Sequence, residues 1–262
     1  MSKENLLILM VSLLLLACNA KKDNTITKLN CLPTQLTYQY GFIQGYPKVV
    51  YTYEKEQISQ INHFDSTNLL VMIDKYYYDA NGSVSNYEQF KLSGGTFNQA
   101  INAKFYYKNQ KLISLYTDYL YTQVLSIDSC FYDQNGLLQK ILNYTRYGGN
   151  MDTLYNHYDS LVFNNNKDLS EHWTKWVGDN LVYKLYSFEY GSKKNTIYLI
   201  PPIGVIPNAK YILNKRNNFK KDGTQYPSQD YKYEYDELGN ITKVYEYFLD
   251  ETNTSIYQYK CN

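Results

Sequence analysis

The sequence predicts an all-β protein, a long antiparallel up-and-down meander of about 14–16 strands in one curved sheet. Three observations predict this fold. A Tyr-Asp-x-x-Gly turn recurs along the chain, a second set of glycine turns alternates with it, and tyrosines repeat at every second position between the turns. Helical periodicity is not convincing anywhere in the chain.

The recurring turn has three clear copies. Asp can hydrogen-bond the backbone two residues ahead, and Gly supplies the positive φ that tight hairpins need. Less regular copies follow Thr52, Tyr106, Phe163 and Glu189. Each copy is predicted to join two strands. The clear copies consist of Tyr78, Asp79 and Gly82; Tyr132, Asp133 and Gly136; and Tyr235, Asp236 and Gly239.

A second set of turns lies between these copies. The segments are "SGG" at 93–95, "YGGN" at 147–150 and "VGDN" at 177–180. Turn signals therefore come roughly every ten to fifteen residues, which favours consecutive hairpins over crossover connections.

Between the turns, segments such as "YKYEYD" and "KVYEYF" place tyrosines two residues apart. This spacing predicts one aromatic face and one hydrophilic face. Tyr makes up 32 of 262 residues and the mean hydropathy is −0.52, so tyrosine rings must supply much of the buried area. Three prolines in "IPPIGVIPNAKY" predict a loop near 200–210 that crosses or caps the sheet.

The N-terminal segment predicts export. A charged start and a short apolar run are typical of a secretory signal, and "LLAC" resembles the lipobox of bacterial lipoproteins. The predicted organisation is a signal peptide at 1–17, a lipidated flexible tether at 18–30 that begins with Cys18, and one sheet domain at 31–262. An ordinary signal cut after Ala20 is the alternative.

Charge and motifs exclude several classes of function. The chain has 26 basic and 25 acidic residues without a basic block, which disfavours a nucleic-acid partner. Metal-ligand spacings, a nucleophile elbow and a phosphate-binding loop are missing, so we predict no metal, no cofactor and no catalytic residues. His63 and His157 lie in the similar segments "NHFDS" and "NHYDS", which favours a structural role for both. His172 is the third histidine.

Apart from Cys18, the chain has three cysteines. Cys31 and Cys261 bracket the predicted strands and could form a disulfide in an oxidising compartment, or they could remain two thiols that never meet. Cys130 alternates like a strand residue and is predicted to be a small buried hydrophobe.

Trp173 and Trp176 are the candidates for ligand contact. Because they are three residues apart, a regular strand would point them to opposite faces. An exposed ring near Gly178 could stack on a sugar or a partner protein, although edge packing explains the pair equally well.

The Tyr-Asp-x-x-Gly tips resemble the YD repeats of Rhs-type proteins. The lipobox, the tyrosine-rich meander and the proline-rich insertion before "EYDELGNITK" are similar to Bacteroidota lipoproteins of unknown function with a single-layer, porin-like curved sheet. This resemblance implies an open sheet or half-barrel on an outer-membrane lipoprotein, and it brings no catalytic residues. The "KKD" after Cys18 resembles a surface-export signal, so the cell surface is preferred slightly over the periplasm. A membrane-embedded barrel would need an apolar outward band, which the alternation does not show.

The leading functional prediction is a lipid-anchored, non-enzymatic binding or scaffold module of the cell envelope, with a glycan or an envelope protein as partner. One alternative is a glycan-active hydrolase that uses two carboxylates on the sheet. Another is a structural partner of an outer-membrane complex.

Overall fold

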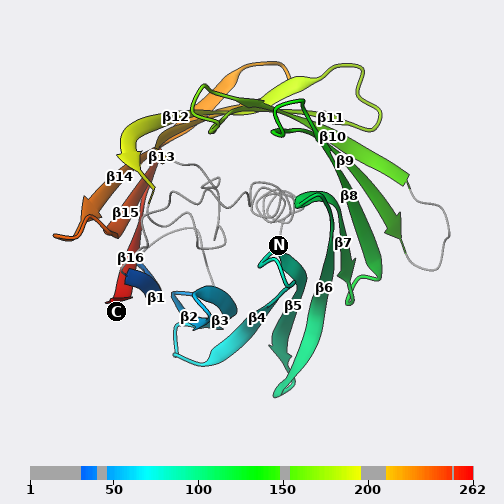
Figure 1. Cartoon of the computed structure of the whole chain (residues 1–262). Helices are drawn as coiled ribbons and strands as arrows, with labels where there is room; N and C mark the ends of the chain where they lie inside the picture. The colour runs from blue at the N-terminus through cyan, green and yellow to red at the C-terminus, as the bar shows by residue number, and fades with distance from the viewer. Residues whose placement is uncertain (1–30, 40–45, 148–153, 196–210, 250, 262) are drawn as a thin grey trace. The chain divides into compact units, whose positions relative to one another are not determined.

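The computed structural model describes residues 31–39, 46–147, 154–195, 211–249 and 251–261 (Figure 1). Consecutive strands run antiparallel in every pair whose register is described, which confirms the predicted meander. Within the described ranges the secondary structure is entirely β. The sixteen strands are β1 (Cys31–Gln39), β2 (Lys48–Glu54), β3 (Gln57–Phe64), β4 (Leu70–Tyr78), β5 (Val84–Ser93), β6 (Thr96–Lys108), β7 (Lys111–Tyr119), β8 (Val124–Tyr132), β9 (Leu138–Tyr147), β10 (Leu154–Phe163), β11 (Leu169–Trp176), β12 (Tyr183–Lys194), β13 (Tyr211–Phe219), β14 (Gln225–Tyr235), β15 (Ile241–Phe248) and β16 (Glu251–Cys261).

The predicted open half-barrel is wrong, because the first strand pairs with the last. The hydrogen-bonded order runs through all sixteen strands and returns from β16 to β1, which is the order of a closed barrel. β1 is paired with β2 on one side and with β16 on the other. This pairing satisfies the backbone groups that two free edge strands would leave open. The predicted proline-rich loop, the signal segment, Cys18 and the tether lie outside the described residues.

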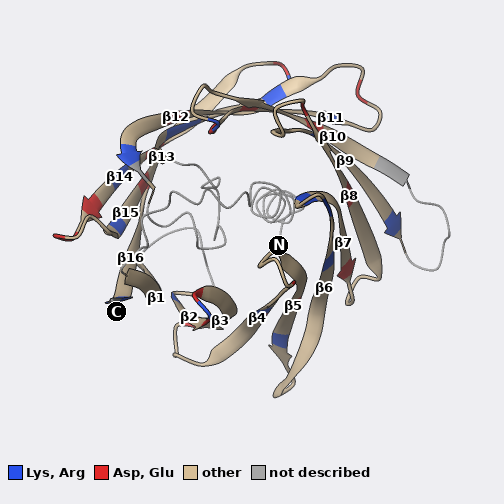
Figure 2. Cartoon of the chain, in the orientation of Figure 1, with Lys and Arg blue, Asp and Glu red and all other residues tan. Residues whose placement is uncertain are grey.

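Contacts within the sheet group the described residues into two compact units. We call residues 103–147, 154–195 and 211–228 the histidine unit. We call residues 31–39, 46–102, 229–249 and 251–261 the tyrosine unit. Basic and acidic side chains both occur along the strands of each (Figure 2). None of the described segments forms a helix long and apolar enough to cross a membrane.

The Tyr-Asp-x-x-Gly copies form three-residue loops. At the first copy, the Asp79 carboxylate accepts hydrogen bonds from the backbone N–H groups of Asn81 and Ser83, each at 2.9 Å. The N–H of Gly82 donates to the Asp79 carbonyl at 3.0 Å, and Gly82 has a φ of 78°. The loops at Asp133 and Asp236 have the same backbone pattern, with Gly136 and Gly239 in the left-handed region.

The less regular copies differ from one another. Residues 164–168 repeat the three-residue loop, with Asn164 in the place of the aspartate. The segment after Glu189 is not a turn, because Gly191 lies inside β12. The "SGG" and "VGDN" segments lie between strands, with Gly94, Gly95 and Gly178 at positive φ.

The hairpin between β2 and β3 has a two-residue loop whose residues are unfavourable for the backbone conformation that they adopt. Lys55 and Glu56 are exposed and have φ values of 51° and 66°. Two positive values are typical of a type I′ turn, which favours Asn-Gly. We expect the double change Lys55→Asn and Glu56→Gly to stabilise the fold by about 1 kcal/mol, or a rise in Tm of about 2–4 °C. Thermal unfolding followed by circular dichroism measures this.

A matched control is available at the three-residue loop after Tyr132. Changing Gln134→Asn and Asn135→Gly introduces the same dipeptide where neither residue has a positive φ. The control should leave the Tm unchanged or lower it. Equal increases in both variants would contradict the argument from backbone strain.

The repeat tyrosines join neighbouring strands. The hydroxyl of Tyr78 at the end of β4 donates to the carbonyl of Ile58 in β3 at 2.6 Å, and Tyr132 in β8 donates to Leu112 in β7 at 2.8 Å. Tyr190 bonds Leu169 in the same way at 2.8 Å. Each ring is therefore partly buried while its hydroxyl keeps a partner. Burial raises the pKa of Tyr78 to about 12.

The predicted aromatic face is present in the tyrosine unit, where Tyr51, Tyr87 and Tyr231 are buried. Burial raises the pKa of Tyr51 well above its ordinary value. In the histidine unit the prediction is wrong, because few of its buried residues are aromatic and about half of them are polar. Its buried polar residues include Asp128, Asn143, Thr145, His157, Asp159, His172, Thr174 and Arg216.

Candidate functional site

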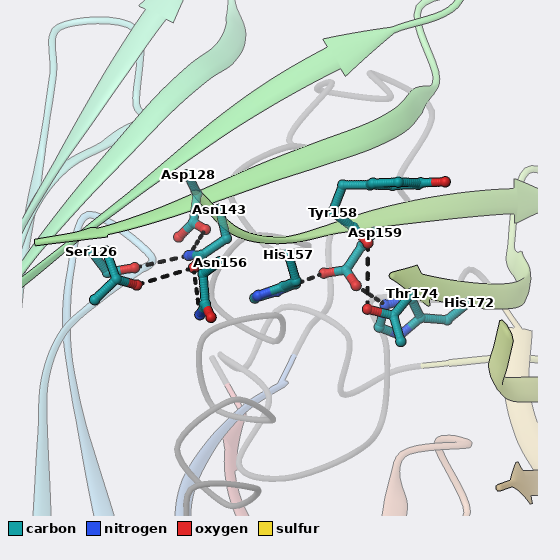
Figure 3. A network of polar contacts seen from close by, with 10 residues as sticks. Ser126, Asp128, Asn143, Asn156, His157, Tyr158, Asp159, His172 and Thr174 are labelled. Atoms are coloured by element: carbon teal, nitrogen blue, oxygen red, sulfur yellow. Dashed lines mark hydrogen bonds and ion pairs between the residues drawn. The ribbon is translucent and has the colours of Figure 1, made fainter. Parts of the chain in front are cut away.

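The buried face of the histidine unit holds a group of ionisable residues on neighbouring strands (Figure 3). We call His157 and Asp159 of β10 and His172 of β11 the His–Asp cluster. His157 Nε2 lies 3.4 Å from Asp159 Oδ2, and His172 Nε2 lies 3.0 Å from Asp159 Oδ1. Each residue is 3% exposed. One carboxylate therefore contacts two imidazoles away from bulk water.

The strand geometry explains how these side chains meet. His157 and Asp159 are two residues apart on β10, so they share a face. His172 of β11 lies opposite Leu161 of β10 in the register. Asp159 is two residues before Leu161 on β10, so it is a diagonal neighbour of His172 on the same face. The register of β9 and β10 shifts between Tyr155 and His157, which leaves Asn156 as an extra residue. Bulges of this kind re-aim neighbouring side chains.

A second set of polar side chains continues the cluster along β8 and β9. Asn143 Nδ2 donates to Asp128 Oδ1 at 2.5 Å and to Ser126 Oγ at 2.9 Å. Asn143 Oδ1 accepts from Asn156 Nδ2 at 3.1 Å (Figure 3). Asn143 thus links Asp128 to the bulge that precedes His157.

The pKa values of the two buried aspartates, Asp128 and Asp159, are shifted in opposite directions. Burial raises the pKa of Asp128 to about 7, and the nearby charge of Asp159 also raises it. The hydrogen bond from Asn143 and the charge of His157 lower this pKa, but they do not outweigh burial. Burial also acts to raise the pKa of Asp159, but the charges and hydrogen bonds of His172 and His157 outweigh it and hold this pKa well below its usual range. Asp128 can therefore keep a proton near neutral pH, whereas Asp159 stays ionised.

Two atoms of the His–Asp cluster and its neighbours on β8 and β9 are fully buried and have neither a hydrogen-bond partner nor an ion-pair contact within the described residues. They are Asp128 Oδ2 and His157 Nδ1. A buried polar atom without a partner is costly, so such atoms in a native protein require an explanation such as a bound molecule. These two atoms make the region a candidate ligand site.

The two tryptophans point to opposite faces, as the three-residue spacing predicts. Trp176 lies opposite His157 in the register, and the centroids of their rings are 4.5 Å apart. Trp173 lies on the other face, where its Nε1 donates to Glu171 Oε2 at 2.8 Å and Lys184 Nζ is 5.0 Å from the ring centroid. Only Trp176 adjoins the His–Asp cluster.

The tyrosine unit has a smaller polar group that is fully hydrogen-bonded at its aspartate. His63 Nε2 lies 2.7 Å from Asp74 Oδ2, and Asp74 Oδ1 accepts from Tyr87 at 2.7 Å and Gln89 at 3.0 Å. The likeness between "NHFDS" and "NHYDS" does not extend to geometry, because Asp65 closes an exposed loop whereas Asp159 is buried in β10. A structural role suits His63.

The cysteines are placed as follows. Cys31 is buried and disulfide-bonded, and it lies opposite Cys261 in the register of β1 and β16. The pairing of Cys31 with Cys261 stays a prediction. Cys130 is buried on β8. Across the described ranges, no three His, Cys, Asp or Glu side chains converge as a metal site.

No known protein family matches the sequence, and no curated protein matches it. Among solved structures, the chain is similar to a porin-like protein from Bacteroides uniformis, with 13% identity over 87% of this chain and 98% of that one and a TM-score of 0.44. A porin-like protein from Bacteroides vulgatus gives 12% identity, the same coverage and a TM-score of 0.41. The lipid anchor and the YD repeats stay predictions.

No sequence motif singles out Asp128, Asp159 or Arg216, and the repeated segment around His157 favours a structural role for that residue. The sequence signal that could have identified them is the alternation in "SIDSC" and "NHYDS", where Ser126 and Asp128, and His157 and Asp159, lie two residues apart on a strand. This pattern is compatible with a solvated face as well as with a buried one.

Proposed function

We propose that this chain is a lipid-anchored outer-membrane protein, displayed at the cell surface, that binds a glycan without cleaving it. The observation behind the proposal is the pair of unpartnered buried atoms, Asp128 Oδ2 and His157 Nδ1, with the Trp176 ring packed on His157. The anchor rests on the lipobox that ends at Cys18.

A sugar suits these side chains. Its hydroxyl groups both donate and accept, so one ring could donate to Asp128 Oδ2 and exchange a hydrogen bond with His157 Nδ1. Aromatic rings provide the apolar surface on which the C–H face of a sugar packs. Tyr183, which is hydrogen-bonded to Trp176, adds a second ring beside it.

A glycan-active hydrolase is the second candidate, and the opposed pKa values of Asp128 and Asp159 favour it. Such enzymes use one protonated and one ionised carboxyl. In this protein, however, each oxygen of Asp159 already contacts an imidazole. That arrangement suits a structural anion better than a nucleophile, so binding is the preferred function.

A glycan array with the full-length protein in mild detergent tests the proposal. We expect binding to a defined glycan, and a loss of affinity of about tenfold in Trp176→Ala, equal to about 1.4 kcal/mol. Trp173→Ala is the matched control and should bind like the wild type, because that ring lies on the other face. Release of reducing ends from the bound glycan would favour the hydrolase. Absence of glycan binding, together with stable co-purification of an outer-membrane protein, would support an assembly role instead.

A further inference from the structure

Arg216 of β13 is a buried cation on the same face of the histidine unit. It is 7% exposed and lies opposite Phe188 of β12 in the register. Its guanidinium carbon is 5.0 Å from the centroid of the Tyr186 ring. Its Nε and Nη1 atoms are buried, and neither has an acceptor within the part of the chain that the structure describes.

A buried guanidinium with two N–H groups that lack an acceptor is unusual. A guanidinium stays charged at every pH that a protein survives, so it cannot escape its burial by losing a proton. Asp128 is different, because burial raises its pKa to about 7 and the side chain can be neutral. Contact with the Tyr186 ring offsets only part of the cost of burying a charge. The buried N–H groups at Nε and Nη1 of Arg216 therefore need an anionic acceptor.

Arg216 is connected to the candidate site through a series of side chains. The Tyr186 ring centroid is 5.8 Å from that of His172, and His172 contacts Asp159. Asp159 contacts His157, on which Trp176 packs. The anionic group and the sugar ring could therefore belong to one ligand.

We propose that Arg216 is the anchor of an oxyanion-binding site, and that the ligand of this protein is an acidic glycan that carries a carboxylate, phosphate or sulfate group. The acidic glycan rests on the proposed function, whereas the oxyanion site does not. Arg216 donates to the oxyanion while Tyr186 supports the guanidinium from its face. Both carboxylate oxygens of Asp159 already contact an imidazole, which leaves Arg216 available for an external anion.

Isothermal titration of the full-length protein in detergent tests the site. The probes are inorganic phosphate, inorganic sulfate and glucuronate, with glucose as the neutral comparison. We expect saturable binding of at least one anion at one site per chain, and a loss of about tenfold or more in affinity in Arg216→Gln. Arg216→Lys keeps the charge and should bind with an intermediate affinity. Lys215→Gln is the matched control, because Lys215 lies opposite Glu189 in the register of β12 and β13, on the other face of the sheet, and should not affect binding.

Thermal unfolding separates a ligand anchor from a structural arginine. Without added anion, Arg216→Gln should unfold at the same temperature as the wild type or higher, since it removes an unpaired buried charge. The anion should raise the Tm of the wild type only. A lower Tm in Arg216→Gln combined with no anion binding to the wild type would overturn the inference, and so would anion binding that Arg216→Gln leaves unchanged.

Trp176→Ala distinguishes failure of this inference from failure of the proposed function. If the glycan proposal alone is wrong, inorganic phosphate still binds and Trp176→Ala leaves its affinity unchanged. If the oxyanion site alone is wrong, glycans on the array bind through Trp176 regardless of their charge, and Arg216→Gln binds them like the wild type.

Discussion

Asp159→Asn is expected to destabilise the protein by about 3 kcal/mol at pH 7, the largest effect of any single conservative change that we predict. The variant keeps the size of the side chain but removes the negative charge between His157 and His172. Both imidazoles are 3% exposed, so water cannot replace the lost partner.

The loss should depend on pH in a defined direction. The pKa of Asp159 is held below its usual range by the two histidines. A depressed carboxyl pKa stabilises the fold above the unfolded-state value of about 3.9, and this contribution disappears as the pH falls through the folded-state value. The difference between wild type and Asp159→Asn should therefore be nearly constant from pH 7 to pH 5 and become smaller below about pH 4.

Urea unfolding followed by tryptophan fluorescence measures this, because both tryptophans lie in β11, the strand that carries His172. Asp118→Asn is the control, since Asp118 lies on the opposite face of β7 and its change should cost less than about 0.5 kcal/mol. Equal losses at about pH 2 and pH 7 would contradict the role of Asp159 as a buried anion.

Asp128→Asn is expected to have the opposite effect. Asp128 keeps its proton to a pH of about 7 in the folded protein, whereas the unfolded chain releases it near about 3.9. A raised carboxyl pKa gives stability that is fully present below the unfolded value and is lost as the pH rises through the folded value. Asparagine stays neutral, so its advantage over the wild type should grow by about 1.4 kcal/mol per pH unit between pH 4 and pH 7.

The measurement is the same unfolding experiment at each pH from 4 to 8. Asn143 still donates to an oxygen in the variant, since asparagine keeps one at Oδ1. A constant difference between Asp128→Asn and the wild type across this range would show that Asp128 is ionised throughout and that the buried carboxyl is compensated by another group.

The sequence predicted the parts of this protein that depend on nearby residues. The loops after Tyr78 and Tyr132 follow from aspartate and glycine within five positions, because the carboxylate and the positive φ act on the adjacent backbone. The strands follow from alternation, and the opposite faces of Trp173 and Trp176 follow from their spacing.

The candidate site could be predicted less well, for a physical reason. Whether "NHYDS" is solvated or buried depends on what covers that face of β10, and a period of two gives no information on this point. The contact between Asp159 and His172 depends on the register between β10 and β11, which the loop after Phe163 fixes. The similar segment "NHFDS" favoured a structural role for His157, and that interpretation stays a prediction.

By itself, the sequence determined the local structure, because turn chemistry and side-chain alternation operate within a few residues of the chain. Only the tertiary structure decided that β1 pairs with β16, that Asp159 contacts two histidines, and that Arg216 is buried without an acceptor in the described chain. These features depend on strand register and on burial, which bring together residues that lie far apart in the sequence.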